Sequence, residues 1–236
     1  IDCGSQMQFP RLVRTYLRSR GVNRLDGLLL THGDAAHIGA AANVARVFRP
    51  LSIIDNAAPD RSSAHRALLA STLPIDATAA PRELKIGRDL TAQILFPPNE
   101  FKGDTADDQA FIIQLTTAYG WRVLLTSDSG EASERWIREN WDDVRSDVLI
   151  KGQHKSAPSG SPEFLDCVHP QLIVASSIPF PANEEVREDW AADVAARGIK
   201  LFRQDETGAV TLRFFRNRFE AVPFLRRDQT FRSERR

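Results

Sequence analysis

The chain has 236 residues, and 42% of them are hydrophobic, which is enough to fill a folded core. Its 31 basic residues balance its 31 acidic residues, so overall charge favours neither nucleic acid nor anionic lipid as a partner. No run approaches the roughly 20 apolar residues that a membrane span needs, and no signal segment opens the chain, so we expect it to be soluble as given. Cys3 and Cys167 match no zinc-ligand spacing and indicate free thiols in a reducing compartment.

Residues 1–56 read as helices and strands that alternate along the chain. A helix is predicted over residues 8–21, on the helical spacing of Phe9, Leu12, Val13, Tyr16 and Leu17 before Gly21. Short apolar strands are expected at 25–32 and 51–56, with a small-residue helix at 38–50 between them. The opening IDCGSQ has no initiator Met and resembles the end of a strand, so we expect the protein to continue upstream.

The rest of the chain changes from a β-rich middle to a regular alternation. Residues 57–81, which carry His65, are expected to hold a helix within a long excursion. Strands are predicted at 84–87, 90–98 and 110–130, the last folding back at Tyr119-Gly120. Helices at 132–140, 161–169 and 183–198 then alternate with strands at 147–152, 171–177 and 200–204, before a hairpin at 205–215. We interpret the chain as one α/β domain with two sheets inside and helices outside.

The segment GLLLTHGDAAHIGAAANV, residues 27–44, ends an apolar strand in three side chains of the kinds that bind metals. His32 and Asp34 stand two apart in the turn after the strand, and His37 begins the next helix. Imidazole and carboxylate groups on a rigid strand end suit zinc or manganese. The alternative is that His32 and His37 are capping or solvent-facing polar residues of a loop.

Two further predicted strands end in polar side chains. In RVLLTSDSGEASERW, Asp128 follows an apolar strand and precedes a helix, a position at which a lone aspartate also serves as an N-cap. In DVLIKGQHKSAPSGSPEF, Gln153 and His154 follow the next buried strand. In such folds, binding sites lie where strands end and the following helices begin. We therefore expect these side chains to converge at one edge of the sheets: His32, Asp34, His37, Asp128 and His154.

The order of these segments resembles the metallo-β-lactamase superfamily, and within it the C-terminal domain of ComEC-type DNA-internalisation proteins. The family's metal loop S/T-H-x-D-x-D-H-x-G-G is similar to THGDAAHIGA at 31–40. Its LLTGD resembles LLTSD at 124–128, its DVLKVPHHGS resembles DVLIKGQHKS at 147–156, and its DEDGAITV resembles DETGAVTL at 205–212. The resemblance covers residues 2–212 and implies a metallo-β-lactamase-like αββα sandwich that lacks its first strands.

Four positions depart from the family pattern. Ala36 replaces the second aspartate of the metal loop, Gln153 and Lys155 replace the first histidine and the glycine of HHGS, and Pro179-Phe180-Pro181 stands at the late G-H-P. The ring of Phe180 is then expected to close the second metal pocket beside Ala36. Lys155 either replaces part of the missing positive charge or is a solvated loop residue.

By this resemblance, one divalent ion, zinc or manganese, keeps His32, Asp34 and Asp128 as ligands. A second ion keeps only His37 and Asp128, so its site is expected to be empty or very weak. The implied chemistry is metal-dependent attack of water on a phosphodiester, with His154 protonating the leaving oxygen.

Three functions remain open at this point. The chain is a metal-dependent phosphodiesterase or nuclease of a DNA-uptake protein, a metal-poor pseudo-enzyme that binds single-stranded DNA or a partner, or a stand-alone hydrolase of a small substrate. In the first two readings the inner membrane is reached only through a region upstream of this chain. Domain boundaries are predicted at 1–212 for the metallo-β-lactamase-like domain and 213–236 for the final strand and an Arg-rich tail, which is either solvated or a phosphate-contacting arm.

Overall fold

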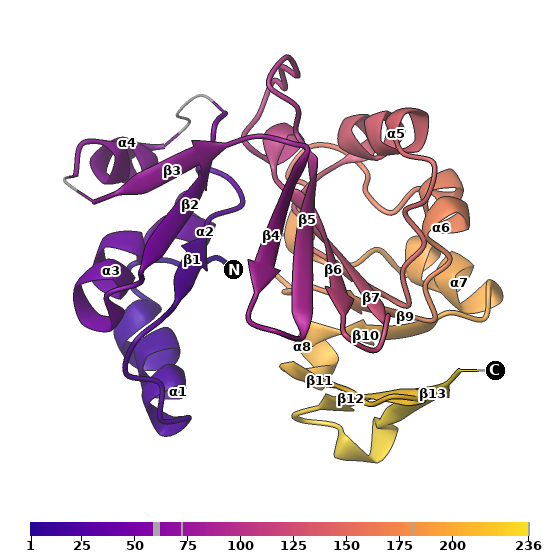
Figure 1. Cartoon of the computed structure of the whole chain (residues 1–236). Helices are drawn as coiled ribbons and strands as arrows, with labels where there is room; N and C mark the ends of the chain where they lie inside the picture. Colours follow the sequence, from indigo (N-terminus) through magenta and orange to yellow (C-terminus); the bar gives the residue numbers. More distant parts are fainter. Residues whose placement is uncertain (59–61, 72, 181, 236) are drawn as a thin grey trace. The chain divides into compact units, whose positions relative to one another are not determined.

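The computed structural model describes residues 1–58, 62–71, 73–180 and 182–235, and its backbone contacts divide the chain into two compact units (Figure 1). Unit 1 consists of Ile1–Ala80 and Pro97–Phe111, and unit 2 of Pro81–Phe96 and Ile112–Arg236. The two units interleave along the sequence, so their boundaries do not coincide with the predicted one at residue 212. No helix within the described ranges is long and apolar enough to cross a membrane.

Unit 1 is built on a parallel sheet in the order β1-β2-β3. Its strands are β1 (Gly27–Leu29), β2 (Ser52–Asn56) and β3 (Ile75–Thr78). Its helical segments are η1 (Phe9–Val13), α1 (Arg14–Ser19), α2 (Ala35–Ile38), α3 (Ala41–Phe48), α4 (Ser63–Leu69) and η2 (Asp107–Gln109). The strand and helix types predicted for residues 8–56 are confirmed, whereas β3 was not predicted. Residues 59–61 and 72 of the predicted excursion lie outside the described residues.

The core of unit 1 forms where the helices cover the small sheet. Its buried members include Leu30, Ile38, Val44, Phe48, Ile53 and Leu68. Phe9 packs edge to face on Phe48, with ring centroids 6.4 Å apart. Leu12 and Tyr16 are 60% and 63% exposed, so the apolar stripe of the first helix is wider than the surface that it buries.

Unit 2 contains a seven-stranded sheet in the order β10-β9-β8-β7-β6-β5-β4. Its strands are β4 (Arg82–Ile86), β5 (Leu90–Phe96), β6 (Ile112–Thr117), β7 (Arg122–Ser127), β8 (Val148–Lys151), β9 (Leu172–Ala175) and β10 (Lys200–Arg203). Neighbours from β4 to β7 are antiparallel, and those from β7 to β10 are parallel. Parallel strands need crossover connections, which α5 (Glu131–Asn140), α6 (Pro162–Val168) and α7 (Glu188–Ala196) supply along one face of the sheet (Figure 1).

The C-terminal part of unit 2 is a second, antiparallel sheet. After η3 (Ala182–Glu184) and α8 (Gln204–Thr207), the chain forms β11 (Val210–Phe214), β12 (Arg218–Pro223), η4 (Arg227–Gln229) and β13 (Phe231–Glu234). Phe219 and Ala221 of β12 pack in one buried cluster with Val148 and Phe202 of the seven-stranded sheet. Trp121, which directly precedes β7, belongs to the same cluster. The hairpin predicted at 205–215 is wrong, because Gln204–Thr207 is helical and β11 instead pairs with β12. The region predicted as a final strand and tail contains β12 and β13. Arg218 and Arg232 both pair with Glu220 on this sheet.

Three strands end just before the predicted site residues. In unit 1, β1 ends three residues before His32, and in unit 2, β7 ends immediately before Asp128 and β8 ends three residues before His154. The N-cap of α5 is Gly130, so the alternative in which Asp128 caps that helix is wrong. The sequence pattern thus located the strand ends that carry polar side chains in each unit.

Candidate metal centre

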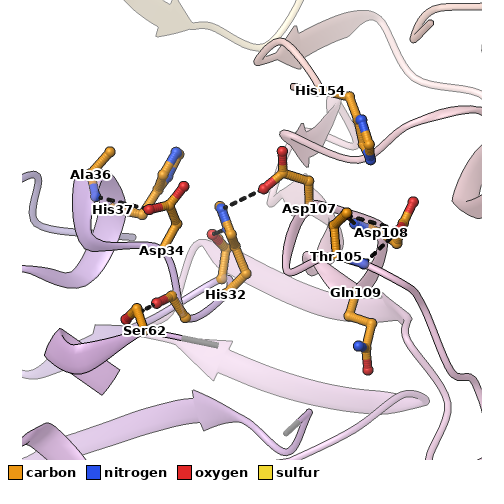
Figure 2. A network of polar contacts seen from close by, with 12 residues as sticks. His32, Asp34, Ala36, His37, Ser62, Thr105, Asp107, Asp108, Gln109 and His154 are labelled. Atoms are coloured by element: carbon orange, nitrogen blue, oxygen red, sulfur yellow. Dashed lines mark hydrogen bonds and ion pairs between the residues drawn. The ribbon is translucent and has the colours of Figure 1, made fainter. Parts of the chain in front are cut away.

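His32, Asp34 and Asp107 of unit 1 each offer one ligand atom, and these three atoms lie within 4.8 Å of one another (Figure 2). His32 Nε2 is 3.8 Å from Asp107 Oδ1, and both side chains are almost fully buried. Two atoms that each lie about 2 Å from one ion are at most about 4 Å apart, so this pair fits a shared ion with little movement. The donor set of one imidazole and two carboxylates suits zinc or manganese.

A hydrogen-bonded chain fixes which nitrogen of His32 faces Asp107. The Thr31 hydroxyl donates to Asp2 Oδ2 at 2.8 Å and lies 2.9 Å from His32 Nδ1. Since the hydroxyl has a single hydrogen, it accepts from His32, and the neutral ring carries its proton on Nδ1. His32 Nε2 and Asp107 Oδ1 therefore face each other as two lone-pair atoms, an arrangement that a cation stabilises.

Asp2 orients His37 in the same way. Its Oδ2 lies 3.0 Å from His37 Nδ1, which donates to the carboxylate and leaves the lone pair on Nε2. Burial by itself would raise the pKa of Asp2, but the hydrogen bond from His37, the positive charges that His37 and His32 carry when protonated, and the Thr31 amide together hold that pKa below its ordinary value. The rings of His32 and His37 lie 4.3 Å apart between centroids. When the two rings are neutral, both histidines present an unprotonated Nε2.

The loop that carries Asp34 is shaped by a helix start and by α4. Asp34 is the N-cap of α2, and its Oδ1 accepts from the Ala36 amide at 3.5 Å. On the other side, Ser62 donates to the Gly33 carbonyl, and a Cβ at Gly33 would lie 3.0 Å from His65 Nδ1. A side chain at residue 33 would therefore require His65 or the loop to shift slightly. His32 is 2% exposed, so the alternative in which it is a solvent-facing loop residue is wrong.

The loop that carries Asp107 is fixed by its own turn and by Asn56. Asp108 accepts from the amide and the hydroxyl of Thr105, at 2.9 and 2.8 Å (Figure 2). Asn56, at the end of β2, donates to the Thr31 carbonyl at 2.9 Å and to the Gln109 carbonyl at 2.6 Å. One buried amide therefore ties the residue before His32 to the short helix that begins at Asp107.

Replacing Asn56 by Ala is expected to lower the free energy of unfolding by about 2–3 kcal/mol, because two hydrogen bonds to buried carbonyls are lost. Urea denaturation followed by circular dichroism measures the change. Asn140→Ala, which removes an exposed side-chain hydrogen bond to Trp136, is the control and should stay within about 0.5 kcal/mol of the parent. Equal effects of the two variants would show that the hydrogen bonds of Asn56 to the two carbonyls do not stabilise the fold to this extent.

The other predicted residues belong to unit 2. Asp128 follows β7 and packs so closely on Gly152 that a Cβ there would lie 1.8 Å from its Oδ1. His154 is 5% exposed and Lys155 is exposed. Their participation in the metal site stays a prediction. Phe180 is 85% exposed, so the expectation that its ring closes an apolar pocket is wrong, and Pro181 lies outside the described residues.

Three contributors to the site were missed from the sequence. These are Asp2, Asn56 and Asp107, to which the sequence patterns give no role at the site. The signal available for Asp107 was an acidic pair, Asp107-Asp108, shortly before the strand predicted to begin at residue 110. That pair resembles any solvated loop, and only burial of Asp107 at 2% exposure distinguishes it.

Comparisons with known proteins agree with the fold. Residues 1–117 match the family model described as "Metallo-beta-lactamase superfamily". The metallo-beta-lactamase fold protein YhfI from Bacillus subtilis has a TM-score of 0.56 and 16% identity, over 86% of this chain and 82% of that one. The predicted α/β class and metallo-β-lactamase fold are confirmed. Members of this superfamily usually bind divalent metals, and the candidate ligands in unit 1 agree with that property.

Two curated relatives are competence proteins. ComE operon protein 3 of Bacillus subtilis is 23% identical over 84% of this chain, and competence protein ComA of Neisseria gonorrhoeae is 29% identical over 82%. The chain spans 26% of the length of each. The predicted similarity to ComEC-type proteins is confirmed for the region that this chain covers.

Proposed function

We propose, from the premise that this chain carries a domain of the metallo-β-lactamase superfamily, that it is a metal-dependent phosphodiesterase domain of a DNA-uptake protein. The observation that carries the proposal is the convergence of His32, Asp34 and Asp107 within 4.8 Å, together with the tautomer that turns His32 Nε2 toward Asp107. DNA is proposed as the substrate because the curated relatives are competence proteins.

The chain's own residues supply a cage of one nitrogen and two oxygens. Asp34 and Asp107 bring two negative charges to a largely buried place, which favours a divalent cation over water. A divalent ion bound there supplies Lewis-acid activation of water and of a phosphoryl oxygen. His32 is held in its ligating tautomer by Thr31, so little reorganisation precedes binding. Asp128 is retained as a proposed further ligand on the strength of the family pattern alone.

A single ion is favoured over a pair by the composition of the metal loop. Ala36 has no ligand atom where the family has its second aspartate, and its side chain is exposed. The exposed ring of Phe180 offers no ligand at the late position. These two positions also favour a second candidate function, in which the domain binds DNA without cleaving it.

Metal-dependent cleavage by the purified chain tests the proposal. Single-stranded and duplex DNA are incubated with the protein and Mn²⁺ or Zn²⁺, alongside His32→Ala, Asp128→Asn and the control Asp142→Asn, which replaces an exposed acid. We expect cleavage that His32→Ala and Asp128→Asn each reduce at least about 100-fold, because loss of a ligand removes the ion or misplaces it. DNA binding without cleavage, at an affinity that metal does not change, would overturn the proposed enzymatic function and favour the DNA-binding domain.

A further inference from the structure

His154 has its ring nitrogens arranged in the opposite sense to those of His32 and His37. Its Nδ1 accepts two backbone hydrogen bonds, from the Ser156 amide at 3.1 Å and the Ala157 amide at 2.9 Å. A backbone N–H only donates, so both bonds require a lone pair on Nδ1. The neutral ring therefore carries its proton on Nε2.

Packing within unit 2 holds the ring in this orientation. A Cβ at Gly130, the N-cap of α5, would lie 2.8 Å from His154 Cδ2, so the ring packs closely against this glycine. Turning the ring over would place Cδ2 against the two amides and lose both hydrogen bonds. The loop after His154 is anchored by buried Glu134, whose carboxylate accepts from the amides of Gly160 and Ser161.

This tautomer limits what His154 does chemically. A histidine that ligates a metal through Nε2, or that delivers a proton as imidazolium, needs hydrogen on Nδ1. Protonating Nδ1 would set its hydrogen against two N–H donors and break both bonds. The role compatible with this tautomer is a hydrogen bond from Nε2–H to an acceptor such as an anionic oxygen, in which the proton stays on the ring.

The ring also lines a cavity that is formed by unit 2 alone. The cavity has a volume of about 770 Å³, and its wall includes Lys151, His154, Lys155 and Trp190. The wall also carries five carboxylates, and salt bridges to arginines offset four of them: Glu131, Glu185, Asp189 and Asp193. Lys151 and Lys155 add positive charge to the same wall, which suits an anionic ligand. A hydrogen-bond donor at this position fits a phosphodiester oxygen.

We propose that His154 is a neutral Nε2–H donor to a phosphodiester oxygen, and that it is neither a metal ligand nor the proton-delivering acid predicted from the sequence. This role rests on the proposed phosphodiesterase function. The tautomer itself does not depend on that function, so the two are tested separately.

Nitrogen-15 NMR of the full chain, recorded with long-range proton correlations between pH 6 and 8, reads the tautomer directly. For the neutral ring, observed at the alkaline end of this range, we expect His154 to show a pyridine-type Nδ1 and a protonated Nε2, while neutral His32 and His37 in metal-free protein show the reverse. A neutral His154 ring with its hydrogen on Nδ1 would overturn the inference, whether or not the protein cleaves DNA.

Two variants then separate donation from proton transfer. Glutamine places an amide N–H near the Nε2 position but cannot act as an acid at neutral pH. We expect His154→Ala to lower kcat about 100-fold and His154→Gln to retain activity within about tenfold of the parent. Equal losses in both folded variants, with a larger loss for substrates that have poorer leaving groups, would identify a general acid and overturn the proposal. If the parent protein does not cleave DNA, the proposed phosphodiesterase function is refuted. The NMR result would still determine the tautomer of His154.

Discussion

Asp107→Asn is expected to weaken binding of Mn²⁺ or Zn²⁺ at least about 100-fold, because an amide oxygen replaces a charged ligand next to His32. The carboxylate lies 3.8 Å from His32 Nε2 and is buried, so no solvent-exposed group takes its place without a rearrangement of the loop. Isothermal titration of metal-free protein measures the dissociation constant, and metal analysis after gel filtration measures the stoichiometry.

Asp108→Asn is the matched control for this variant. Asp108 is the next residue and has the same chemistry, but its carboxylate accepts from Thr105 inside the turn. The asparagine oxygen still accepts these bonds, so metal affinity should stay within about threefold of the parent. Equal metal affinity in Asp107→Asn and Asp108→Asn would remove Asp107 from the ligand set and leave the centre to other residues.

The stability of the chain is expected to rise with pH between 8 and 10 because of one buried lysine. Lys151 is 4% exposed, donates to the Gly152 carbonyl at 2.8 Å and lies 4.9 Å from the centroid of the Trp190 ring. Burial lowers the pKa of Lys151 from 10.5 to about 8, against the opposing charges of Glu134 and Asp128. Above pH 8 the folded chain therefore releases a proton that the unfolded chain still binds.

The sign of the effect follows from that difference in bound protons. Where the unfolded state binds more protons, the free energy of unfolding increases with pH. From pH 7 to pH 10 the parent should therefore gain about 2–3 kcal/mol relative to Lys151→Met, in which the titrating group is absent. Urea denaturation at pH 7, 8, 9 and 10 measures this difference.

Lys155→Met provides the comparison, since Lys155 lies four residues further along the chain and is exposed. Its unfolding free energy should run parallel to that of the parent across the whole pH range. A constant difference between the parent and Lys151→Met over these four pH values would contradict a depressed pKa for Lys151.

The positions of the strands and of their polar ends could be predicted from the sequence. Apolar runs of strand length stop before His32, Asp128 and His154, and this pattern depends only on neighbours along the chain. The same local signals located the turn at Tyr119-Gly120, where Gly120 has φ +78°. Family motifs then predicted His32, Asp34 and His37 as the metal loop, which lies within the residues that match the metallo-beta-lactamase superfamily model.

Tertiary structure alone brought Asp107 to His32. The two lie far apart in sequence and meet because Asn56 bonds the carbonyls of Thr31 and Gln109. The tertiary structure also determined which side chains are buried, and two cases differ from the sequence expectation. Tyr16, on a predicted apolar face, is exposed, whereas Lys151, at the end of a strand, is buried. Local periodicity describes which face a residue occupies, but burial depends on which element covers that face.

The protonation pattern of the histidines was likewise decided only in three dimensions. His32, His37 and His154 are the same residue type, and each lies after the end of a strand. In the neutral rings, Thr31 and Asp2 place the proton of His32 and His37 on Nδ1, whereas two backbone amides place that of His154 on Nε2. The sequence determined that imidazoles stand at strand ends. Which nitrogen each offers follows from hydrogen-bond partners that the folded chain brings within 3.1 Å, because a ring nitrogen facing a donor keeps its lone pair and one facing an acceptor keeps its hydrogen.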